Sequence, residues 1–230
     1  MYLNGFVDQA NKIIFGYEQP LSYLEGRVIS KGDIEKFSIG YVKFARIYDD
    51  KSDDYKQLFE STNKFRGLQN RLIFPLRNIL GYVNGLVVRS LDKKSYIQYF
   101  LDEAKKIGAF FGLYEALPHI LRTKKVFVHE GAIDAISFAK VFPNSISSLT
   151  SFLNEQQFEQ LKFFADKIIL VYDKDEAGLT GIKKMSQVYG EQYIDHLFVG
   201  DNDPNSCLKS MGVEKFERFL KHKVPFLLQE

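Results

Sequence analysis

Hydrophobic and polar residues alternate in short strand-length and helix-length runs in the first half of the chain. Arg71–Leu76 and Tyr82–Val88 are apolar runs of strand length with a short turn between them, which predicts a β-hairpin. Residues 6–27 predict a helix, and the turn Ser30–Asp33 predicts the start of another short helix. The acidic stretch 49–54 predicts an exposed loop. We therefore expect a mixed α/β subdomain over about residues 1–120.

The pattern changes near Lys124, where predicted strands and helices begin to alternate. Ile168–Tyr172 is a continuous apolar run of the kind buried on both faces of a parallel sheet. Asn154, with Gln157 three residues later, predicts the capped start of a helix. The predicted strands are 126–128, 145–149, 168–172 and 196–199, and the predicted helices are 132–141, 154–164 and 176–189. Alternation of this kind predicts an α/β domain at 121–212 with a doubly wound, mainly parallel sheet, followed by a helical tail at 213–230.

Acidic residues follow three of these predicted strands, at the point where each strand ends. Because ligands of such sheets bind at the carboxyl ends of the strands, these acids are expected to face one cleft. Gly131 is expected to permit the tight turn from strand to helix. If the strand that starts at Ile168 continues to Asp175, its period of two points Asp173 and Asp175 the same way. The three groups are Glu130 with Asp134, Asp173 with Asp175, and Asp201 with Asp203.

Several carboxylates in one cleft repel each other unless cations neutralise them. Oxygen ligands without histidine or cysteine favour Mg²⁺, or Mn²⁺ in its place. Two such ions about 4 Å apart support in-line displacement at phosphorus. Any one group could equally be a helix cap or part of an exposed loop, and it is the combination of three that indicates a metal site.

Basic residues are concentrated between Lys64 and Lys106. This segment contains nine lysines and arginines against three acids, a local excess that could follow a phosphate backbone, although a solvated surface explains such a run equally well. The whole chain has a net charge of only +2 and is 45% hydrophobic, which is typical of globular proteins. No apolar run approaches the roughly 20 residues that cross a bilayer.

Cys207 is the only cysteine among 230 residues, and four histidines are scattered along the chain. The sequence therefore predicts no intramolecular disulfide, no zinc site of the usual Cys/His spacing and a reducing, cytoplasmic setting.

The runs 126–134 and 168–178 resemble the Toprim signature, in which a strand ends in Glu-Gly with Asp four residues later and a second strand ends in Asp-x-Asp. Primases, type IA and type II topoisomerases, OLD nucleases and recombination mediators share that domain.

The first half of the chain distinguishes among these protein classes. Arg71–Arg77, Gly81 and Gly85–Arg89 resemble the bacterial DnaG primase pattern of Arg-φ-φ-Phe-Pro-φ, a turn glycine and a strand ending in arginine. Further similar segments are Tyr23–Arg27, Phe37–Tyr41 and Gly112–Ala116, so the resemblance spans about residues 16–210 in family order.

The resemblance implies the catalytic core of a primase, which copies single-stranded DNA into short RNA primers by metal-dependent nucleotidyl transfer. Glu130, Asp173 and Asp175 are then the catalytic acids. The metal-binding set implied is Glu130, Asp134, Asp173, Asp175 and Asp203. The residues implied to bind template and nucleotide are Arg66, Arg71, Arg77, Arg89, Lys94 and Lys106.

The sequence departs from the family pattern at two positions. Asn205 stands where the bacterial enzymes usually carry a second aspartate after Asp-Pro, so one negative charge is absent, although an asparagine can still offer a carbonyl oxygen. The family's Lys-Tyr pair is interrupted here as Lys94-Ser95-Tyr96. Phage primase-helicases also carry an asparagine near the position of Asn205, which suggests a phage or mobile-element origin for this chain.

The resemblance also implies partners. These are single-stranded DNA, ribonucleoside triphosphates, a replicative helicase and a zinc-bearing domain supplied in trans, in a bacterial cell or a phage-infected host, with no membrane. A Toprim nuclease or topoisomerase is the alternative enzyme, although no tyrosine stands out as a topoisomerase nucleophile, and a non-catalytic nucleic-acid-binding module is the alternative without an activity.

Overall fold

The chain divides into two compact units, residues 1–109 and residues 110–230. The computed structural model of the protein describes residues 3–43, 68–93, 95–100, 108–200 and 203–224. The sequence placed the boundary at residue 120, whereas the division precedes helix α5 (Leu113–Thr123). Leu113, Ala116 and Ile120 of α5 lie in the hydrophobic core of the second unit, which explains the earlier division.

The first unit begins with two helices where the sequence predicted one. Helix α1 spans Asn4–Ile14 and helix α2 spans Glu18–Glu25. Tyr17 between them is extended, with φ −128° and ψ 120°. Pro20 lies in the first turn of α2, where its missing N–H is tolerated, but it would break the interior of a continuous helix. The single helix predicted over 6–27 is therefore wrong. The third helix, α3 (Lys31–Lys36), was predicted correctly and starts at a capping box made by Ser30 and Asp33.

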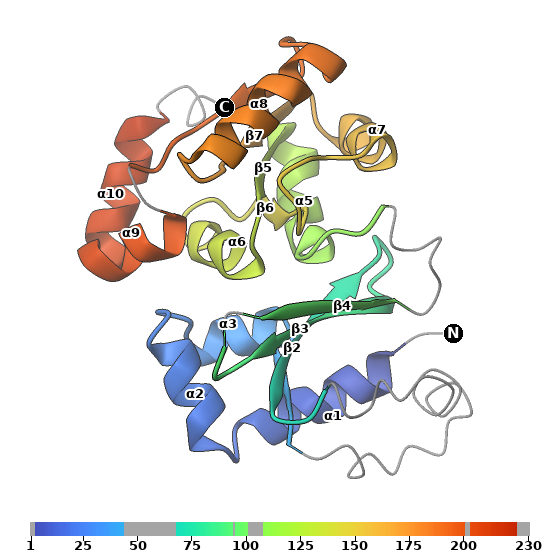
Figure 1. Cartoon of the computed structure of the whole chain (residues 1–230), viewed down its shortest axis with the longest axis vertical. Helices are drawn as coiled ribbons and strands as arrows, with labels where there is room; N and C mark the ends of the chain where they lie inside the picture. The colour runs from blue at the N-terminus through green and yellow to red at the C-terminus, as the bar shows by residue number, and fades with distance from the viewer. Residues whose placement is uncertain (1–2, 44–67, 94, 101–107, 201–202, 225–230) are drawn as a thin grey trace. The chain divides into compact units, whose positions relative to one another are not determined.

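A four-stranded antiparallel sheet completes the first unit (Figure 1). Its strands are β1 (Gly40–Val42), β2 (Arg71–Arg77), β3 (Val83–Ser90) and β4 (Tyr96–Phe100), in that order across the sheet. The hairpin of β2 and β3 confirms the prediction, with Phe74 opposite Val87. Asn4 of α1 holds the hairpin turn, because its amide donates to the Gly81 carbonyl and its oxygen accepts from the Val83 N–H.

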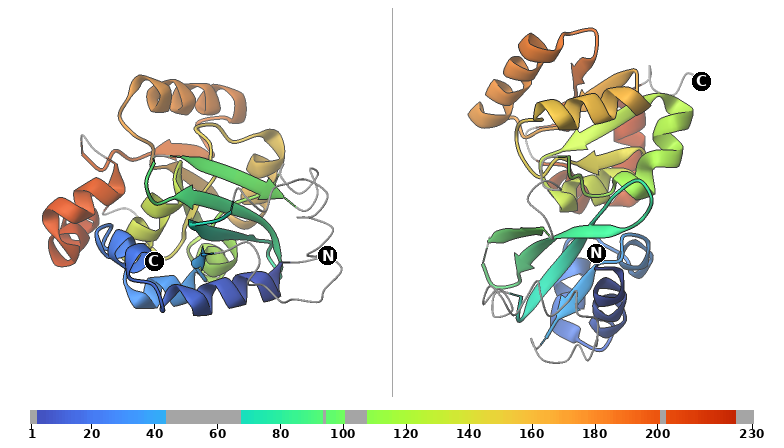
Figure 2. Two further views of the ribbon diagram at one scale, coloured as in Figure 1. Left: turned by 60° about the horizontal axis from the view of Figure 1, so that its bottom comes forward. Right: turned by 90° about the vertical axis from the view of Figure 1, so that its right-hand side faces the viewer.

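Helix α1 covers one face of this sheet (Figure 2). Phe6, Val7 and Ala10 of α1 share a core with alternate residues of the strands, including Ile73 and Leu86. A Cβ at Gly40 would lie 2.6 Å from the Ala10 Cβ, so the absence of a side chain on β1 permits the close approach of α1.

The second unit is built on a four-stranded parallel sheet, as predicted. Its order is β6-β5-β7-β8, and every neighbouring pair is parallel. The strands are β5 (Lys125–His129), β6 (Ser145–Ser147), β7 (Lys167–Leu170) and β8 (Ile194–His196). The helices are α5, α6 (Ala132–Ala139), α7 (Glu155–Phe164), α8 (Glu176–Tyr189), α9 (Pro204–Met211) and α10 (Val213–Lys223).

Helices cover both faces of this sheet, so it is doubly wound. Val126 and Val128 of β5 share a core with residues of α5, α7 and α8. Phe127, between them in sequence, points to the other face and contacts Phe138 of α6, with ring centroids 4.9 Å apart. Helix α9 packs against α6 on that second side (Figure 1).

Two strand predictions in this unit are wrong in their bounds. Strand β8 ends at His196, whereas the sequence placed a strand at 196–199. Strand β7 ends at Leu170 and does not continue to Asp175. Asp175 instead is the N-cap of α8, and its carboxylate accepts a 2.8 Å hydrogen bond from the Gly178 N–H. Alternation along a strand therefore does not determine where Asp173 and Asp175 point.

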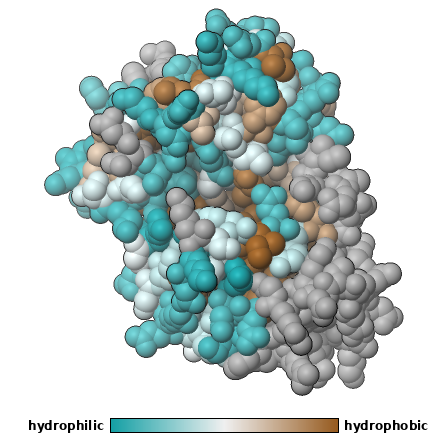
Figure 3. Space-filling view, viewed as in Figure 1, coloured by the Kyte–Doolittle hydropathy of each residue, from teal (hydrophilic) through white to brown (hydrophobic). Residues whose placement is uncertain are grey.

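Hydrophobic side chains on the face seen in Figure 3 are scattered among hydrophilic residues rather than gathered in one broad patch. The most exposed large apolar side chains described are Phe163 and Leu80. Within the described ranges, no helix combines the length and the hydropathy that crossing a membrane requires. The predicted loop at 49–54 lies outside the described residues.

Candidate metal centre and nucleic-acid-binding residues

Glu130 lies immediately after β5, at the carboxyl edge of the parallel sheet. Its loop is held by β6, because Ser147 Oγ donates to the Glu130 carbonyl oxygen at 3.0 Å. Its side-chain Oε1 is buried, and no hydrogen-bond partner for it occurs in the described structure. Burial, followed by the charges of Asp173 and Asp175, raises the pKa of Glu130 to about 7. The first and second acid groups of the sequence therefore lie close together.

Asp134 lies in the first turn of α6 and belongs to the same region. Burial raises its pKa to about 7, and the charge of Asp203 is the next largest cause. Asp203 belongs to the third acid group of the sequence, so the third group approaches the first. The charge of Asp173 also raises the pKa of Asp134.

Gly131 separates these two acids and is needed for a reason different from the predicted one. Its φ of −113° and ψ of 145° are available to any residue, so the turn does not require glycine's conformational freedom. A Cβ at this position would instead lie 2.7 Å from Asp134 Oδ2. Glycine is therefore required by the close approach of the Asp134 carboxyl group.

The remaining acids lie at helix starts. Asp175 caps α8, and Asp203 caps α9 by accepting hydrogen bonds from the Ser206 N–H at 2.7 Å and from the Ser206 hydroxyl at 2.9 Å. Gly178 allows the chain to fold back here, because a Cβ would collide with the Asp173 carbonyl oxygen. The partial positive charge of a helix N-terminus stabilises both carboxylates and partly offsets the repulsion among the acids.

His129 precedes Glu130 and is fully buried. In the described part of the chain neither of its ring nitrogens has a hydrogen-bond partner, and its ring contacts Phe138 with centroids 4.9 Å apart. Burial lowers the pKa of His129 to about 3. The side chain is therefore neutral near pH 7 and adds no positive charge to the acids.

These residues fit a hard divalent cation in their donor chemistry. They offer only oxygen, Glu130 Oε1 is buried without a described partner, and two carboxyl groups have raised pKa values that a cation would reverse. Among the described residues, no three such side chains already stand as an assembled metal site. Like charges separate without a cation, and Asp175 and Asp203 are directed to backbone N–H groups.

The raised pKa values predict that the metal-free protein becomes less stable between about pH 6 and 8. In that window the carboxyl groups of unfolded chains are already ionised, whereas folded Glu130 and Asp134 lose their protons as the pH passes about 7, so raising the pH favours unfolding. We expect a loss on the order of 1 kcal/mol for each group. His129 has the opposite effect on stability, because its lowered pKa favours unfolding as the pH falls. This effect is confined to pH values below the unfolded histidine pKa of about 6.5.

Thermal melts of the metal-free protein, followed by circular dichroism across this pH range, measure the effect. The variant Asp134→Asn should show a smaller decline, and Mg²⁺ should raise the melting temperature most at pH 8. A melting temperature that rises from pH 6 to 8 would contradict the assignment.

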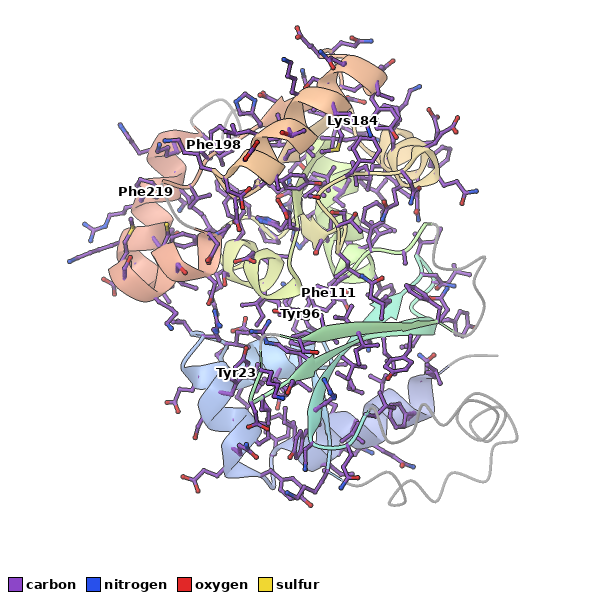
Figure 4. The ribbon with its side chains drawn as sticks, in the orientation of Figure 1. Tyr23, Tyr96, Phe111, Lys184, Phe198 and Phe219 are labelled. Atoms are coloured by element: carbon purple, nitrogen blue, oxygen red, sulfur yellow. The ribbon has the colours of Figure 1, made fainter. Side chains whose placement is uncertain are left out.

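A hollow of about 590 Å³ adjoins Asp175. Its lining includes Phe152, Thr180 and Lys184, and the Lys184 Nζ lies 4.6 Å from the centroid of the Phe152 ring. Figure 4 labels Lys184 on α8. Gly181 allows the loop of Ser151 to pass close to α8, because a Cβ would collide with the Ser151 carbonyl oxygen. The space next to the acids therefore combines an aromatic ring with a cation.

Arg89 is the most enclosed of the described basic candidates in the first unit. It lies on β3 opposite Tyr96 of β4, and its Cζ is 4.3 Å from the Tyr96 ring centroid and 5.3 Å from that of Tyr23. Figure 4 labels both tyrosines. Its side chain is buried, whereas Tyr96 is half-exposed. Two aromatic rings therefore hold the guanidinium group in a defined orientation.

Arg71 and Arg77, at the two ends of β2, do not share that environment. Arg71 is opposite Ser90, whereas Arg89 is opposite Leu72, so the cross-strand register assigns Arg71 and Arg89 to opposite faces of the sheet. The Nη1 atom of Arg71 is buried without a described hydrogen-bond partner. The three described arginines thus do not form one row, and Arg66, Lys94 and Lys106 lie outside the described residues.

Reasoning from sequence missed the two tyrosines at Arg89 and the contacts of Asn205 described below. Tyr96 could have been found by extending the predicted hairpin to a third strand, which places it beside Arg89. No sequence signal connects Tyr23 with either residue, because helix packing brings it there.

Comparison with known proteins finds similarity both to a Toprim-like family and to bacterial DNA primases. A Toprim-like family profile matches residues 127–208, which contain Glu130, Asp134, Asp173, Asp175 and Asp203. The DNA primase of Borreliella burgdorferi is 30% identical over 221 residues, covering 87% of this chain and 42% of that protein. The DNA primase of Lactococcus lactis is 28% identical over 216 residues, covering 86% of this chain and 34% of that protein. The chain therefore spans less than half the length of these relatives.

Solved structures with the same fold cover nearly all of the chain. A DnaG catalytic core has a TM-score of 0.80 at 22% identity, covering 96% of this chain and 78% of that one. A DnaG primase catalytic domain bound to single-stranded DNA has a TM-score of 0.77 at 20% identity, covering 96% and 79%. The zinc-binding and RNA polymerase domains of the Aquifex aeolicus primase give 0.72 at 21% identity, covering 94% and 59%. This chain is thus similar in sequence to bacterial DNA primases, contains a Toprim-like segment and has the fold of the DnaG catalytic core.

Proposed function

We propose that the chain is the catalytic core of a DNA primase and makes short RNA primers on single-stranded DNA. The observation that carries the proposal is the mutual influence of five carboxyl groups at one edge of the parallel sheet. The charges of Asp203 and Asp173 raise the pKa of Asp134, and those of Asp173 and Asp175 raise the pKa of Glu130. Glu130, Asp134, Asp173, Asp175 and Asp203 would together hold Mg²⁺ or Mn²⁺.

The reaction joins a ribonucleotide 3′-hydroxyl to the α-phosphorus of the next triphosphate. A new P–O bond forms, the bond to pyrophosphate breaks, and the hydroxyl proton is released. Bound divalent ions activate such a hydroxyl and stabilise the departing pyrophosphate. The role of Glu130, Asp173 and Asp175 is to fix those ions at the edge of the sheet, and the role of the Toprim helix starts is to orient the carboxylates.

The basic residues of the first unit are proposed to bind template and triphosphate. Arg89 has the strongest support, because its guanidinium lies over the rings of both Tyr96 and Tyr23. The buried Nη1 of Arg71 makes that residue a candidate for a phosphate contact. Arg66, Arg77, Lys94 and Lys106 remain proposals from the resemblance. The similarly folded primase domain that binds single-stranded DNA supports this class of template.

Two further partners are proposed by analogy with relatives. The similarly folded Aquifex primase carries zinc-binding domains as well as RNA polymerase domains. With a single cysteine in 230 residues, a zinc-bearing domain would have to come from outside this sequence. A replicative helicase is the second proposed partner.

Primer synthesis from labelled ribonucleotides on single-stranded DNA tests the proposal. We expect short RNA products in the presence of Mg²⁺ or Mn²⁺ and none when either the template or the metal is omitted. Extension only of a primed template would mean that the chemistry is present and that initiation needs a zinc-bearing partner. Degraded template without any RNA product would contradict a primase and favour a Toprim nuclease.

A further inference from the structure

Asn205, which stands where bacterial primases carry an aspartate, is buried at the start of α9. Only 1% of the residue is exposed. Its backbone N–H donates a 3.1 Å hydrogen bond to Asp134 Oδ1. Its side-chain amide donates a 2.9 Å hydrogen bond to the hydroxyl of Ser137, one turn after Asp134 on α6. One residue of α9 thus contacts α6 at two points 68 and 71 positions away in the sequence.

The orientation of the Asn205 amide follows from the contacts of Ser137. The Ser137 hydroxyl is fully buried and donates its one hydrogen to the Ile133 carbonyl oxygen at 2.8 Å. Its oxygen can therefore only accept from residue 205, which requires an N–H donor there. Asparagine supplies that donor and an ionised aspartate cannot.

We propose that Asn205 is a positioning residue, which fixes the carboxyl group of Asp134 for metal binding and is not itself a metal ligand. The proposal rests on the metal site proposed above. Asp134 Oδ1 accepts the hydrogen bond from the Asn205 N–H, while Oδ2 occupies the space that a side chain at position 131 would fill. The hydrogen bond that the Asn205 side chain donates to Ser137 holds α9 against α6, at the distance at which the Asn205 N–H reaches Asp134.

An aspartate at position 205 would be unfavourable in these surroundings. The charge of Asp203 already acts on the buried Asp134, so another carboxylate in contact with α6 adds repulsion. The carboxylate oxygen of such an aspartate would also face the hydroxyl oxygen of Ser137, with no hydrogen available between the two. The asparagine therefore belongs to a consistent local arrangement with Ser137, rather than being a ligand that has lost its charge.

Direct Mn²⁺ binding, followed by electron paramagnetic resonance well below the melting temperature, tests this role without requiring polymerase activity. The variants are Ser137→Ala and Asn205→Ala, singly and together. We expect each to weaken Mn²⁺ binding by about tenfold, although a buried Ser137 cannot touch an ion. The double variant should lose little more than one single variant, because both act through one hydrogen bond.

Ser145→Ala is the matched control. Ser145 is equally buried, and its hydroxyl donates to the Phe142 carbonyl oxygen at 2.6 Å, but within the described residues it forms no hydrogen bond with α9 or with the acids. Its loss should lower the melting temperature about as much as Ser137→Ala and leave Mn²⁺ affinity unchanged. A purely structural Asn205 would give the same result for all of these variants.

Asn205→Asp separates positioning from ligation. We expect it to lower the melting temperature and to bind no additional Mn²⁺. An additional bound ion or tighter binding in this variant would overturn the proposal, and so would Mn²⁺ affinities within twofold of wild type for both Ser137→Ala and Asn205→Ala. Absence of Mn²⁺ binding by the wild type would overturn the metal site as well. Normal Mn²⁺ binding without primer synthesis would instead contradict only the primase function.

Discussion

Glu130→Gln is expected to abolish nucleotidyl transfer and, at the same time, to increase the stability of the metal-free protein. The activity should fall by about a thousandfold or more, because a bound metal contributes several kcal/mol to stabilising such a transition state. The stability should rise because glutamine removes a charge that burial and two neighbouring aspartates disfavour. With allowance for solvent screening, we expect on the order of 1 kcal/mol at pH 8.

Primer extension and thermal melting of the same preparation measure both effects. A gain of this size corresponds to an increase of about 2–4 °C in the melting temperature of a protein of this length. The control is Glu159→Gln, an exposed α7 residue within 3.7 Å of Lys162, which should change neither quantity appreciably. Loss of activity together with loss of stability would indicate that Glu130 is needed for folding rather than for binding metal.

Arg89→Lys is expected to weaken single-stranded DNA binding by about tenfold even though it conserves the charge. Lysine lacks the planar group that stacks on Tyr96 and Tyr23, and it cannot form the paired hydrogen bonds that guanidinium makes to phosphate. Hydrogen bonds to charged groups contribute about 1.5–3 kcal/mol, which sets the size of the expected loss.

Fluorescence anisotropy at several salt concentrations distinguishes the loss of geometry from the loss of charge. With Arg89→Lys the slope of log affinity against log salt should not change, whereas with Arg89→Ala it should decrease by about one. Tyr96→Phe keeps the ring and should bind as the wild type does. The control is Arg122→Lys, an exposed α5 residue, for which no change is expected. Unchanged DNA affinity of Arg89→Lys would remove Arg89 from the proposed template-binding residues.

The parts of the fold that depend on short-range signals could be predicted from the sequence. The capping boxes at Ser30 and Asn154 join residues only three positions apart, and both occur in the structure. The apolar run at Ile168 forms a buried central strand, paired with β5 on one edge and with β8 on the other. The order of acids along the chain allowed their grouping to be predicted, since parallel strands bring their carboxyl ends to one edge.

The parts that were missed depend on competition between local preferences or on contacts distant in sequence. Asp175 fits both the end of a strand and the cap of a helix, and the available Gly178 N–H favours the cap. Pro20 is compatible with a helix only in its first turn, which was overlooked when one long helix was predicted. The contacts of Asn205 with Ser137 and Asp134 arise from the packing of α9 against α6, which the sequence pattern does not specify.

The order of strands in the second unit has a consequence for synthesis on the ribosome. Strand β5 pairs with β6 and β7, both of which emerge after it, and β7 is separated from it by the whole of α6, β6 and α7. Until Lys167–Leu170 has left the exit tunnel, the N–H and C=O groups along one edge of β5 are unpaired. They can then pair with other nascent chains. The β2–β3 hairpin of the first unit can close within a few residues, so β5 is the segment for which chaperone protection during translation matters most.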